Sequence, residues 1–337
     1  MKQSSFRNQV TKNLNLFMYK WLKMGRVFDP RTVENRPWMK EFAQSPSVVF
    51  FENHLRVYFC CRPLPDANGM YKSYIGYVDF DKNDLSKIIR VSENPVVEHG
   101  GLGSFDEFGT YPVSAIKDGN EIRIYYSSFA RCESVPFNAA VGVATSKDNG
   151  ETFSKIGQGP VLSYSYNEPF VLGSPRIRKF NDKWYLWYVS GQKYVKAENR
   201  AEPVYKIRMA VSDDGLNWTK IGVNLLSDVL EENECQASPD VTFANGKYHM
   251  FFSFRYNLDF KKVGRGYRFG YAQSTDLLNW VRDDKRAGID VSAEGWDSET
   301  VSYGHLFMLK GDTFMFYQGN EMGRYGFGLA KLDGKLN

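Results

Sequence analysis

The stretch Glu107-Phe-Gly-Thr-Tyr-Pro112, followed by a hydrophobic run and then by Ile122-Arg-Ile-Tyr-Tyr-Ser-Ser128, decides the fold because it recurs along the chain. Its order is an acidic residue, a short polar step, a proline, a β-rich run, a turn and a second β-rich run. Five copies occur, and glycine replaces the proline only in the last. The anchors that open the first β-rich run of each copy are Pro46, Pro112, Pro175, Pro239 and Gly304.

These anchors are 66, 63, 64 and 65 residues apart, which indicates an array of one supersecondary unit. Within each unit a hairpin is followed by two further strand-like segments, so the unit is predicted to be a four-stranded antiparallel sheet. Five such sheets arranged about one axis form a five-bladed β-propeller, an all-β fold. The repeat covers nearly the whole chain, so we expect a single domain over residues 1–337 with a lead-in over residues 1–18.

The two ends of the chain carry complementary defects. Trp21-Leu-Lys-Met-Gly25 matches the outermost strands of two later repeats but has no blade of its own. The last repeat ends after three strand-like segments. We expect residues 19–30 to provide the missing fourth strand and close the ring, because an open ring would leave a sheet edge exposed.

Composition excludes several classes of function. The 43 basic and 39 acidic residues give a net charge of +4 without a long run of like charge, so no nucleic-acid partner is indicated. No apolar stretch is long enough for a membrane span. No metal cluster or cofactor motif is present in the pattern.

The N-terminal residues and the cysteines predict a cellular location. The first 20 residues lack the apolar core of a signal peptide. The four cysteines have neither zinc-site nor disulfide-framework spacing, and we expect them to be buried in a reduced, cytoplasmic protein. They are Cys60, Cys61, Cys132 and Cys235.

The starts of the innermost strands are the predicted ligand site. In a propeller these strands run along the central axis, and their starts line a funnel that gathers side chains from several blades. We expect the repeated acids and the residue before each anchor to converge there, and the residues on either side of an anchor to share a face. The candidate binding residues are Asp106, Tyr111, Arg176, Asp240, Arg255, Trp296, Asp297, Glu299, Tyr303 and His305.

The five-fold pattern and the closing Gly326-Phe-Gly-Leu-Ala330 resemble the five-bladed propeller glycosidases, the superfamily of arabinanases, β-xylosidases, invertases and mannoside phosphorylases. Glu234-Cys-Gln-Ala-Ser-Pro-Asp240 is similar to the invertase motif that carries the general acid, and Gly173-Ser-Pro-Arg-Ile177 to a phosphorylase motif. In those families an acid commonly stands at or just before the proline. Here the acids would have to come from upstream, because the residues before the anchors are Ser45, Tyr111, Ser174, Ser238 and Tyr303.

The resemblance implies a glycoside hydrolase that uses paired carboxylates on a small or activated sugar, either a saccharide or a sugar-containing intermediate. Glu234 is predicted to be the acid, with Glu107 or Glu168 as base or charge modulator. Acids crowded in one funnel raise each other's pKa, which would supply the protonated group. Trp296, Tyr111 and Tyr303 are candidates for stacking on a sugar, and Arg62, Arg176 and Arg255 for holding a carboxylate or phosphate.

Two alternative functions stay open. In a glycoside phosphorylase, phosphate would replace the carboxylate base and the arginines would become essential. In a non-catalytic propeller, the funnel would bind a glycan or a protein partner. The repeated acids can also be structural, accepting backbone N–H groups at the start of each inner strand.

Overall fold

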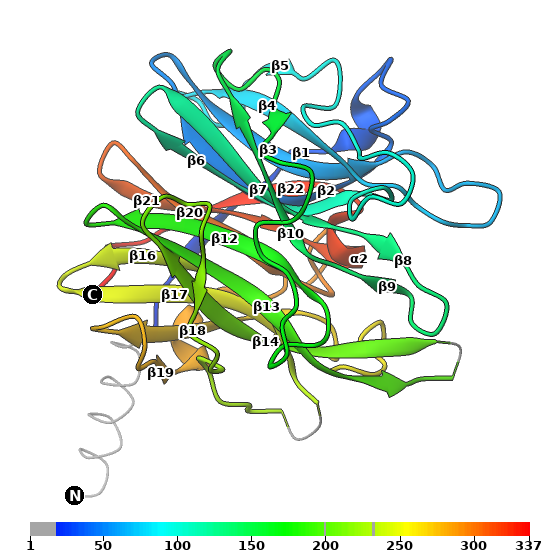
Figure 1. Cartoon of the computed structure of the whole chain (residues 1–337). Helices are drawn as coiled ribbons and strands as arrows, with labels where there is room; N and C mark the ends of the chain where they lie inside the picture. The colour runs from blue at the N-terminus through cyan, green and yellow to red at the C-terminus, as the bar shows by residue number, and fades with distance from the viewer. Residues whose placement is uncertain (1–17, 199, 231–232) are drawn as a thin grey trace, which may run out of the picture.

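The computed structural model describes residues 18–198, 200–230 and 233–337 and is a five-bladed β-propeller (Figure 1). Each blade is a four-stranded antiparallel sheet, as the repeat predicted. Each innermost strand contacts the innermost strands of the two adjacent blades, and β20 of blade 5 contacts β2 of blade 1, so the ring is closed. Among the described residues, no helix is long and apolar enough to cross a membrane.

The first three blades follow one another along the chain, each listed from its innermost strand outward. Blade 1 contains β2 (Glu41–Phe50), β3 (His54–Arg62), β4 (Tyr74–Asp81) and β5 (Ile88–Val91). Blade 2 contains β6 (Thr110–Asp118), β7 (Glu121–Ser128), β10 (Val141–Ser146) and β11 (Ser154–Lys155). Blade 3 contains β12 (Leu172–Phe180), β13 (Lys183–Lys196), β14 (Ala201–Ser212) and β15 (Thr219–Lys220).

The last two blades complete the ring. Blade 4 contains β16 (Cys235–Ala244), β17 (Lys247–Arg255), β18 (Arg268–Ser274) and β19 (Val281–Arg282). Blade 5 contains β20 (Ser302–Leu309), β21 (Asp312–Gln318), β22 (Phe327–Leu332) and the N-terminal strand β1 (Trp21–Phe28). The smaller elements are the hairpin β8 (Ala130–Arg131) and β9 (Phe137–Asn138), the 3-10 turns η1 (Pro30–Thr32) and η2 (Asp284–Ala287), and the short α2 (Asn320–Gly323).

The hydrophobic core is divided among the seams between blades. Four clusters of buried apolar side chains each join two neighbouring blades, and a fifth joins blades 1 and 2 and extends to a few residues of the other three blades. Between blades 5 and 1, for example, Phe59 of β3 packs against Phe327 of β22 with ring centroids 6.0 Å apart. Each Å² of apolar surface buried in a seam contributes about 25 cal/mol of stability, so packing in every seam favours the closed ring.

The innermost strand of every blade carries a β-bulge at its anchor. Register shifts occur there in all five inner hairpins. In four blades the residue before the anchor has a left-handed backbone, with φ of 47° to 55°, and in blade 2 the Tyr111–Pro112 bond is cis. A bulge interrupts the regular alternation of side chains. In blade 1 the residues on either side of the anchor nevertheless face the same strand, because Ser45 Oγ donates to the carbonyl of Val113 and Ser47 Oγ accepts the N–H of Ala115.

Three of these bulges are held by the preceding blade. The backbone N–H of Ser174 donates to Ser127 Oγ at 2.6 Å, and the N–H of Tyr303 donates to Ser253 Oγ at 2.8 Å. At the ring closure, the N–H of Ser45 donates to Gln318 Oε1 at 3.1 Å. An N–H group that the bulge removes from the strand ladder thus gains a partner in the preceding sheet.

The buried cysteines agree with the sequence prediction in three cases. Cys60, Cys61 and Cys235 are buried, and all four cysteines are free thiols. Cys132 is exposed on the turn after β8, so the expectation that it is buried is wrong. That short hairpin lies outside the repeated strands on which the expectation depended.

Closure by the N-terminal strand can be tested at Trp21. This side chain is 8% exposed, packs edge-on against Phe251 and donates from Nε1 to the carbonyl of Ala287. Trp21→Ala is expected to lower the free energy of unfolding by about 3–5 kcal/mol in urea denaturation. The neighbouring Leu22 is 48% exposed, and Leu22→Ala should change it by less than about 0.5 kcal/mol. Equal effects of the two variants would contradict closure by β1.

The inter-blade hydrogen bond at Ser253 provides a second test. Ser253→Ala leaves the buried N–H of Tyr303 without its acceptor and should lower the free energy of unfolding by about 1–3 kcal/mol. Ser302 is the matched control, because it is equally buried and its Oγ has no hydrogen-bond partner among the described residues. Ser302→Ala should therefore be nearly neutral in the same denaturation experiment.

Candidate functional site at the mouth of the central channel

The starts of the innermost strands and the ends of the second strands form one end of the propeller, which we call the mouth. A row of tyrosines crosses it. Tyr111 of blade 2 stacks on Tyr303 of blade 5 with centroids 6.2 Å apart, and Tyr267 meets Tyr303 edge-on at 5.7 Å. The hydroxyl of Tyr205 lies 2.6 Å from that of Tyr267. The convergence predicted for Tyr111 and Tyr303 is present.

Arg62, the last residue of β3, lies at one end of this row. Its guanidinium faces the rings of Phe42, Tyr71 and Tyr111 at 4.5, 5.4 and 5.5 Å. Its Nε has no hydrogen-bond partner, and no carboxylate of the described residues forms an ion pair with it. Burial lowers the pKa of Arg62 below its ordinary value. The side chain is only partly buried, so solvent reaches it.

Arg255, the last residue of β17, lies at the other end. Its guanidinium donates to the carbonyls of Tyr256 and Asn257 and to the hydroxyl of Tyr205. The ring of Phe260 covers it at 3.9 Å. Arg255 is thus fixed by backbone carbonyls and an aromatic ring, and within the described chain it has no carboxylate partner.

Arg176 lies directly below the mouth, inside the channel. It donates to Ser238 Oγ and to the carbonyls of Pro46, Tyr303 and Gly304, so it joins blades 3, 4, 1 and 5. Burial lowers the pKa of Arg176 to about 10. It is 1% exposed, and its side chain fills the channel at this level.

Asp240 and His305 lie deeper in the channel. Asp240 forms an ion pair with Arg178 at 2.5 Å and accepts from the N–H of Leu306. Asp240 forms no ion pair with Arg176, although both are candidate binding residues one position after an anchor. His305 Nδ1 lies 3.7 Å from Asp240, and burial holds the pKa of His305 well below its usual value.

Unpaired buried polar atoms gather at the mouth. Such atoms normally have partners, because an unsatisfied group costs about 1–3 kcal/mol. Here they come from the starts of inner strands, the ends of second strands and the adjoining residues of all five blades. They are Gln44 Oε1, Arg62 Nε, Tyr111 Oη, Ser174 Oγ, Ser190 Oγ, Gln236 Oε1, Arg255 Nε, Asn257 Oδ1, Ser302 Oγ and Gln318 Nε2.

Three of the predicted acids do not face the channel but form the same structural contact in their own blades. Each accepts from a tyrosine hydroxyl of the second strand and pairs with a lysine of the outermost strand. The contacts are Asp106 with Tyr126 and Lys155, Glu168 with Tyr188 and Lys220, and Asp297 with Tyr317 and Lys23. A glycine of the third strand makes room for one of these tyrosines: a Cβ on Gly142 would lie 2.5 Å from Tyr126.

Glu234 has an arginine in the equivalent place. It is fully buried, pairs with Arg282 of β19 at 2.6 Å and accepts the backbone N–H groups of Val229 and Leu230. Burial pushes the pKa of Glu234 upward, but the hydrogen bond and charge of Arg282 outweigh it and leave the pKa below its ordinary value. The expectation of a raised pKa at Glu234 is therefore wrong.

The remaining predicted residues lie apart from the mouth tyrosines. Glu107 is half-buried and accepts from the N–H of Gly103, and Glu299 is exposed. Trp296 packs within blade 5 against Tyr317, with centroids 5.2 Å apart. The catalytic assignments of Glu107, Glu168 and Glu234 stay predictions, and the contacts of Glu168 and Glu234 give both a structural role.

Sequence reasoning left out several residues of the mouth. Glu41 accepts from Arg324 at 2.7 Å and from the Tyr71 hydroxyl at 2.8 Å, beside Arg62. Tyr205 and Tyr267 hold equivalent positions in blades 3 and 4, two residues before Ile207-Arg-Met-Ala210 and Phe269-Gly-Tyr-Ala272. This repeated tyrosine was a signal that could have identified them.

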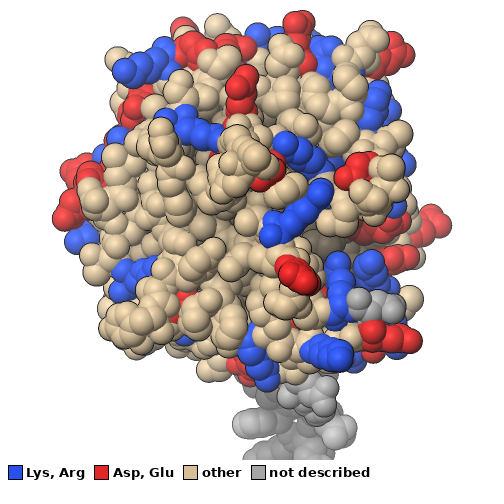
Figure 2. Space-filling model, turned by 45° about the vertical axis from the view of Figure 1, so that its right-hand side comes forward, with Lys and Arg blue, Asp and Glu red and all other residues tan. Residues whose placement is uncertain are grey.

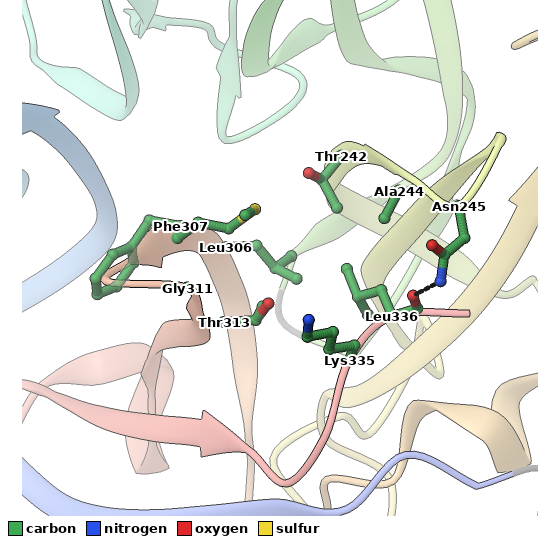
Figure 3. Close-up of a pocket in the computed structure, with 10 residues that line it drawn as sticks. Thr242, Ala244, Asn245, Leu306, Phe307, Gly311, Thr313, Lys335 and Leu336 are labelled. Carbon is green, nitrogen blue, oxygen red and sulfur yellow. Dashed lines mark hydrogen bonds between the residues drawn. The ribbon is translucent and has the colours of Figure 1, made fainter.

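A separate cavity of about 260 Å³ lies at the opposite end of the channel (Figure 3). Thr242 of β16, Leu306 and Phe307 of β20, and Lys335 and Leu336 of the C-terminal segment line it. None of the predicted catalytic residues reaches this cavity. Figure 2 shows acidic and basic side chains interspersed over the face that it presents, rather than one large patch of a single sign.

Comparison with known proteins places the fold and then the family. A solved glycoside hydrolase matches 98% of this chain and 96% of its own, with a TM-score of 0.72 and 14% identity. The chain thus has the five-bladed β-propeller fold of that hydrolase. It belongs to the same family as an uncharacterised protein of Mycobacterium tuberculosis, which is 32% identical over 93% of this chain and 99% of that protein.

A more distant relative has a described activity. The 1,2-β-oligomannan phosphorylase of Thermoanaerobacter sp. is 25% identical over 65% of this chain and 67% of its own length. No protein-family model matches the chain.

The structural role of Glu168 predicts a pH-dependent loss of stability. Burial raises the pKa of Glu168, but Lys220 and Arg208 outweigh it, so the folded-state pKa is below the ordinary 4.5. The ion pairs thus contribute stability above pH of about 4.5, and this contribution is lost as the pH falls through the lowered folded value. Glu168→Gln should lower the free energy of unfolding by roughly 3 kcal/mol at pH 7, with a smaller difference at pH 3.

Glu107→Gln is the matched control for this experiment, because Glu107 accepts only one backbone N–H and pairs with no cation among the described residues. Its effect on urea denaturation at pH 7 should stay below about 0.5 kcal/mol. A Glu168→Gln protein as stable as the parent at pH 7 would contradict the structural role.

Proposed function

We propose that the protein is an enzyme that acts on glycosyl bonds, with the mouth as its active site. The observation that carries the proposal is the gathering of unpaired buried polar atoms from all five blades at the mouth. A saccharide presents many hydroxyl groups, and each can donate to or accept from such atoms. The aromatic rings of Tyr111 and Tyr303 add apolar surface for a sugar ring. The shared fold with a solved glycoside hydrolase supports the proposal.

Between the two classes of reaction, the geometry favours phosphorolysis. Hydrolysis in this superfamily needs two carboxyl groups about 5–9.5 Å apart on either side of the bond. At the mouth, the described residues present Glu41, engaged by Arg324 and Tyr71, and Glu321, engaged by Arg324 and Tyr325. Phosphate is its own nucleophile and needs no carboxylate base. The similarity to an oligomannan phosphorylase supports this choice.

The proposed reaction balances without a further reactant. An oxygen of dihydrogen phosphate attacks the anomeric carbon, and the bond from that carbon to the glycosidic oxygen breaks. The phosphate proton passes to the leaving oxygen. The products are a sugar 1-phosphate and a saccharide shortened by one unit. The hydroxyl of Tyr111 stays protonated near neutral pH, because burial raises its pKa, and it can donate a hydrogen bond to the substrate.

Hydrolysis is the second candidate, because the solved structure with the same architecture is a glycoside hydrolase. The two reactions differ in their second substrate. A panel of oligosaccharides that includes β-1,2-linked mannosides, incubated with and without inorganic phosphate, separates them. We expect sugar 1-phosphate to form only when phosphate is present. Free sugar formed without phosphate would mean that the reaction is hydrolysis and not phosphorolysis. No turnover of any panel member would contradict the enzyme proposal.

Ser174 connects this activity to the mouth. Its Oγ is buried without a partner, so Ser174→Ala should leave the melting temperature unchanged. Loss of one hydrogen bond to the substrate should lower kcat/KM by about 2- to 10-fold. Ser154 is exposed on the outermost strand of blade 2, and Ser154→Ala should leave kcat/KM unchanged. Equal kcat/KM for the parent and Ser174→Ala would place the active site elsewhere.

A further inference from the structure

The mouth holds more positive charge than its carboxylates balance. Among the described residues, Arg324 pairs with both Glu41 and Glu321, and Asp240 pairs with Arg178. Arg62, Arg176 and Arg255 have no carboxylate within ion-pair distance, and Arg176 and Arg255 are each no more than 5% exposed. A guanidinium group keeps its charge at neutral pH, and a buried charge without a partner is costly. Three guanidinium groups without a carboxylate partner at one end of a channel favour an anionic ligand.

Arg62 is the guanidinium best placed to touch such a ligand. The N–H groups of Arg176 and Arg255 donate hydrogen bonds to carbonyl and hydroxyl oxygens, which fixes both side chains in place. Arg62 is partly exposed, and its Nε is free. Phe42, Tyr71 and Tyr111 hold its guanidinium plane from several sides, so its planar fork is preorganised for a carboxylate or phosphate.

The surroundings of Arg62 indicate where the anion comes from. Arg62, Arg176, Arg255 and Arg324 face the two carboxylates Glu41 and Glu321, which leaves two positive charges. A phosphoryl group carries roughly −1.5 to −2 charges near neutral pH, so one such group on the ligand would balance them. The rings that hold Arg62 are also surfaces for a sugar, so an acidic group on the saccharide would reach Arg62 while the sugar packs beside it.

We propose that the saccharide bound at the mouth carries its own anionic group, a carboxylate or a phosphate ester, and that Arg62 binds this group. The proposal rests on the proposed function for the saccharide itself. It extends that function from glycosyl bonds in general to those of acidic saccharides, such as uronic acids or sugar phosphates.

Calorimetric titration of the full-length protein at low ionic strength tests the proposal with four probes. They are glucuronic acid, mannose 6-phosphate, mannose and inorganic phosphate. We expect at least one acidic sugar to bind 10-fold or more tightly than mannose, and the preference to weaken at high salt. Arg62→Gln removes the charge and should abolish the preference.

Two further variants keep the test interpretable. Arg131 is an exposed arginine at the same end that pairs with Asp66 and faces Phe108, so Arg131→Gln should bind all four probes like the parent. Arg62→Lys keeps the charge but loses the fork, and it should retain part of the preference if Arg62→Gln fails to fold. Equal affinities for mannose and the acidic sugars would overturn the proposal. Binding of inorganic phosphate without any preference for acidic sugars would overturn it as well.

Failure of this inference and failure of the enzyme proposal give different results. Turnover of neutral oligosaccharides without any preference for acidic probes would contradict only the inference. A preference for acidic probes that depends on Arg62, together with no turnover of any saccharide, would support the binding of acidic sugars and contradict the enzyme proposal.

Discussion

The ring depends on the bulge at the start of each innermost strand and on the side chain that the preceding blade offers to it. A left-handed backbone is uncommon for residues other than glycine, yet serine or tyrosine adopts it here in four blades. Where Ser127, Ser253 or Gln318 accepts the freed N–H, each blade specifies the start of the next. Directly after the bulge of blade 3, Arg176 extends across the channel and donates to the carbonyls of Pro46 and Gly304.

The sequence was sufficient for the architecture because the architecture is repetitive. The spacing of Pro46, Pro112, Pro175, Pro239 and Gly304 predicted the number of blades, and the unpaired Trp21 segment predicted how the ring closes. The orientation of side chains at the mouth could not be obtained in this way. Side chains alternate between the two faces only along a regular strand. Nothing in the amino-acid sequence indicates that the serine before a proline has a positive φ.

The repeated acids misled sequence reasoning for a related physical reason. Symmetry places Asp106, Glu168 and Asp297 at one position in three blades, and there each binds a tyrosine and a lysine of its own sheet. A residue type that recurs at one position in most blades is explained by its contacts within the blade. A residue type that occurs at that position in only a few blades lacks this structural explanation. Arg62 and Arg255 both stand sixteen residues after their anchors, and the other blades have serine, glycine and asparagine there.

The channel itself limits where a ligand can bind. Arg176 joins four blades through carbonyl and hydroxyl oxygens, so moving it aside would break hydrogen bonds of several sheets at once. Below it, Asp240, Arg178 and His305 fill the next level. A ligand that enters at the mouth therefore cannot reach the cavity at the far end, and it meets a floor of fixed positive charge. A floor of positive charge attracts anions, so the same arginine that closes the channel also favours an acidic ligand over a neutral one.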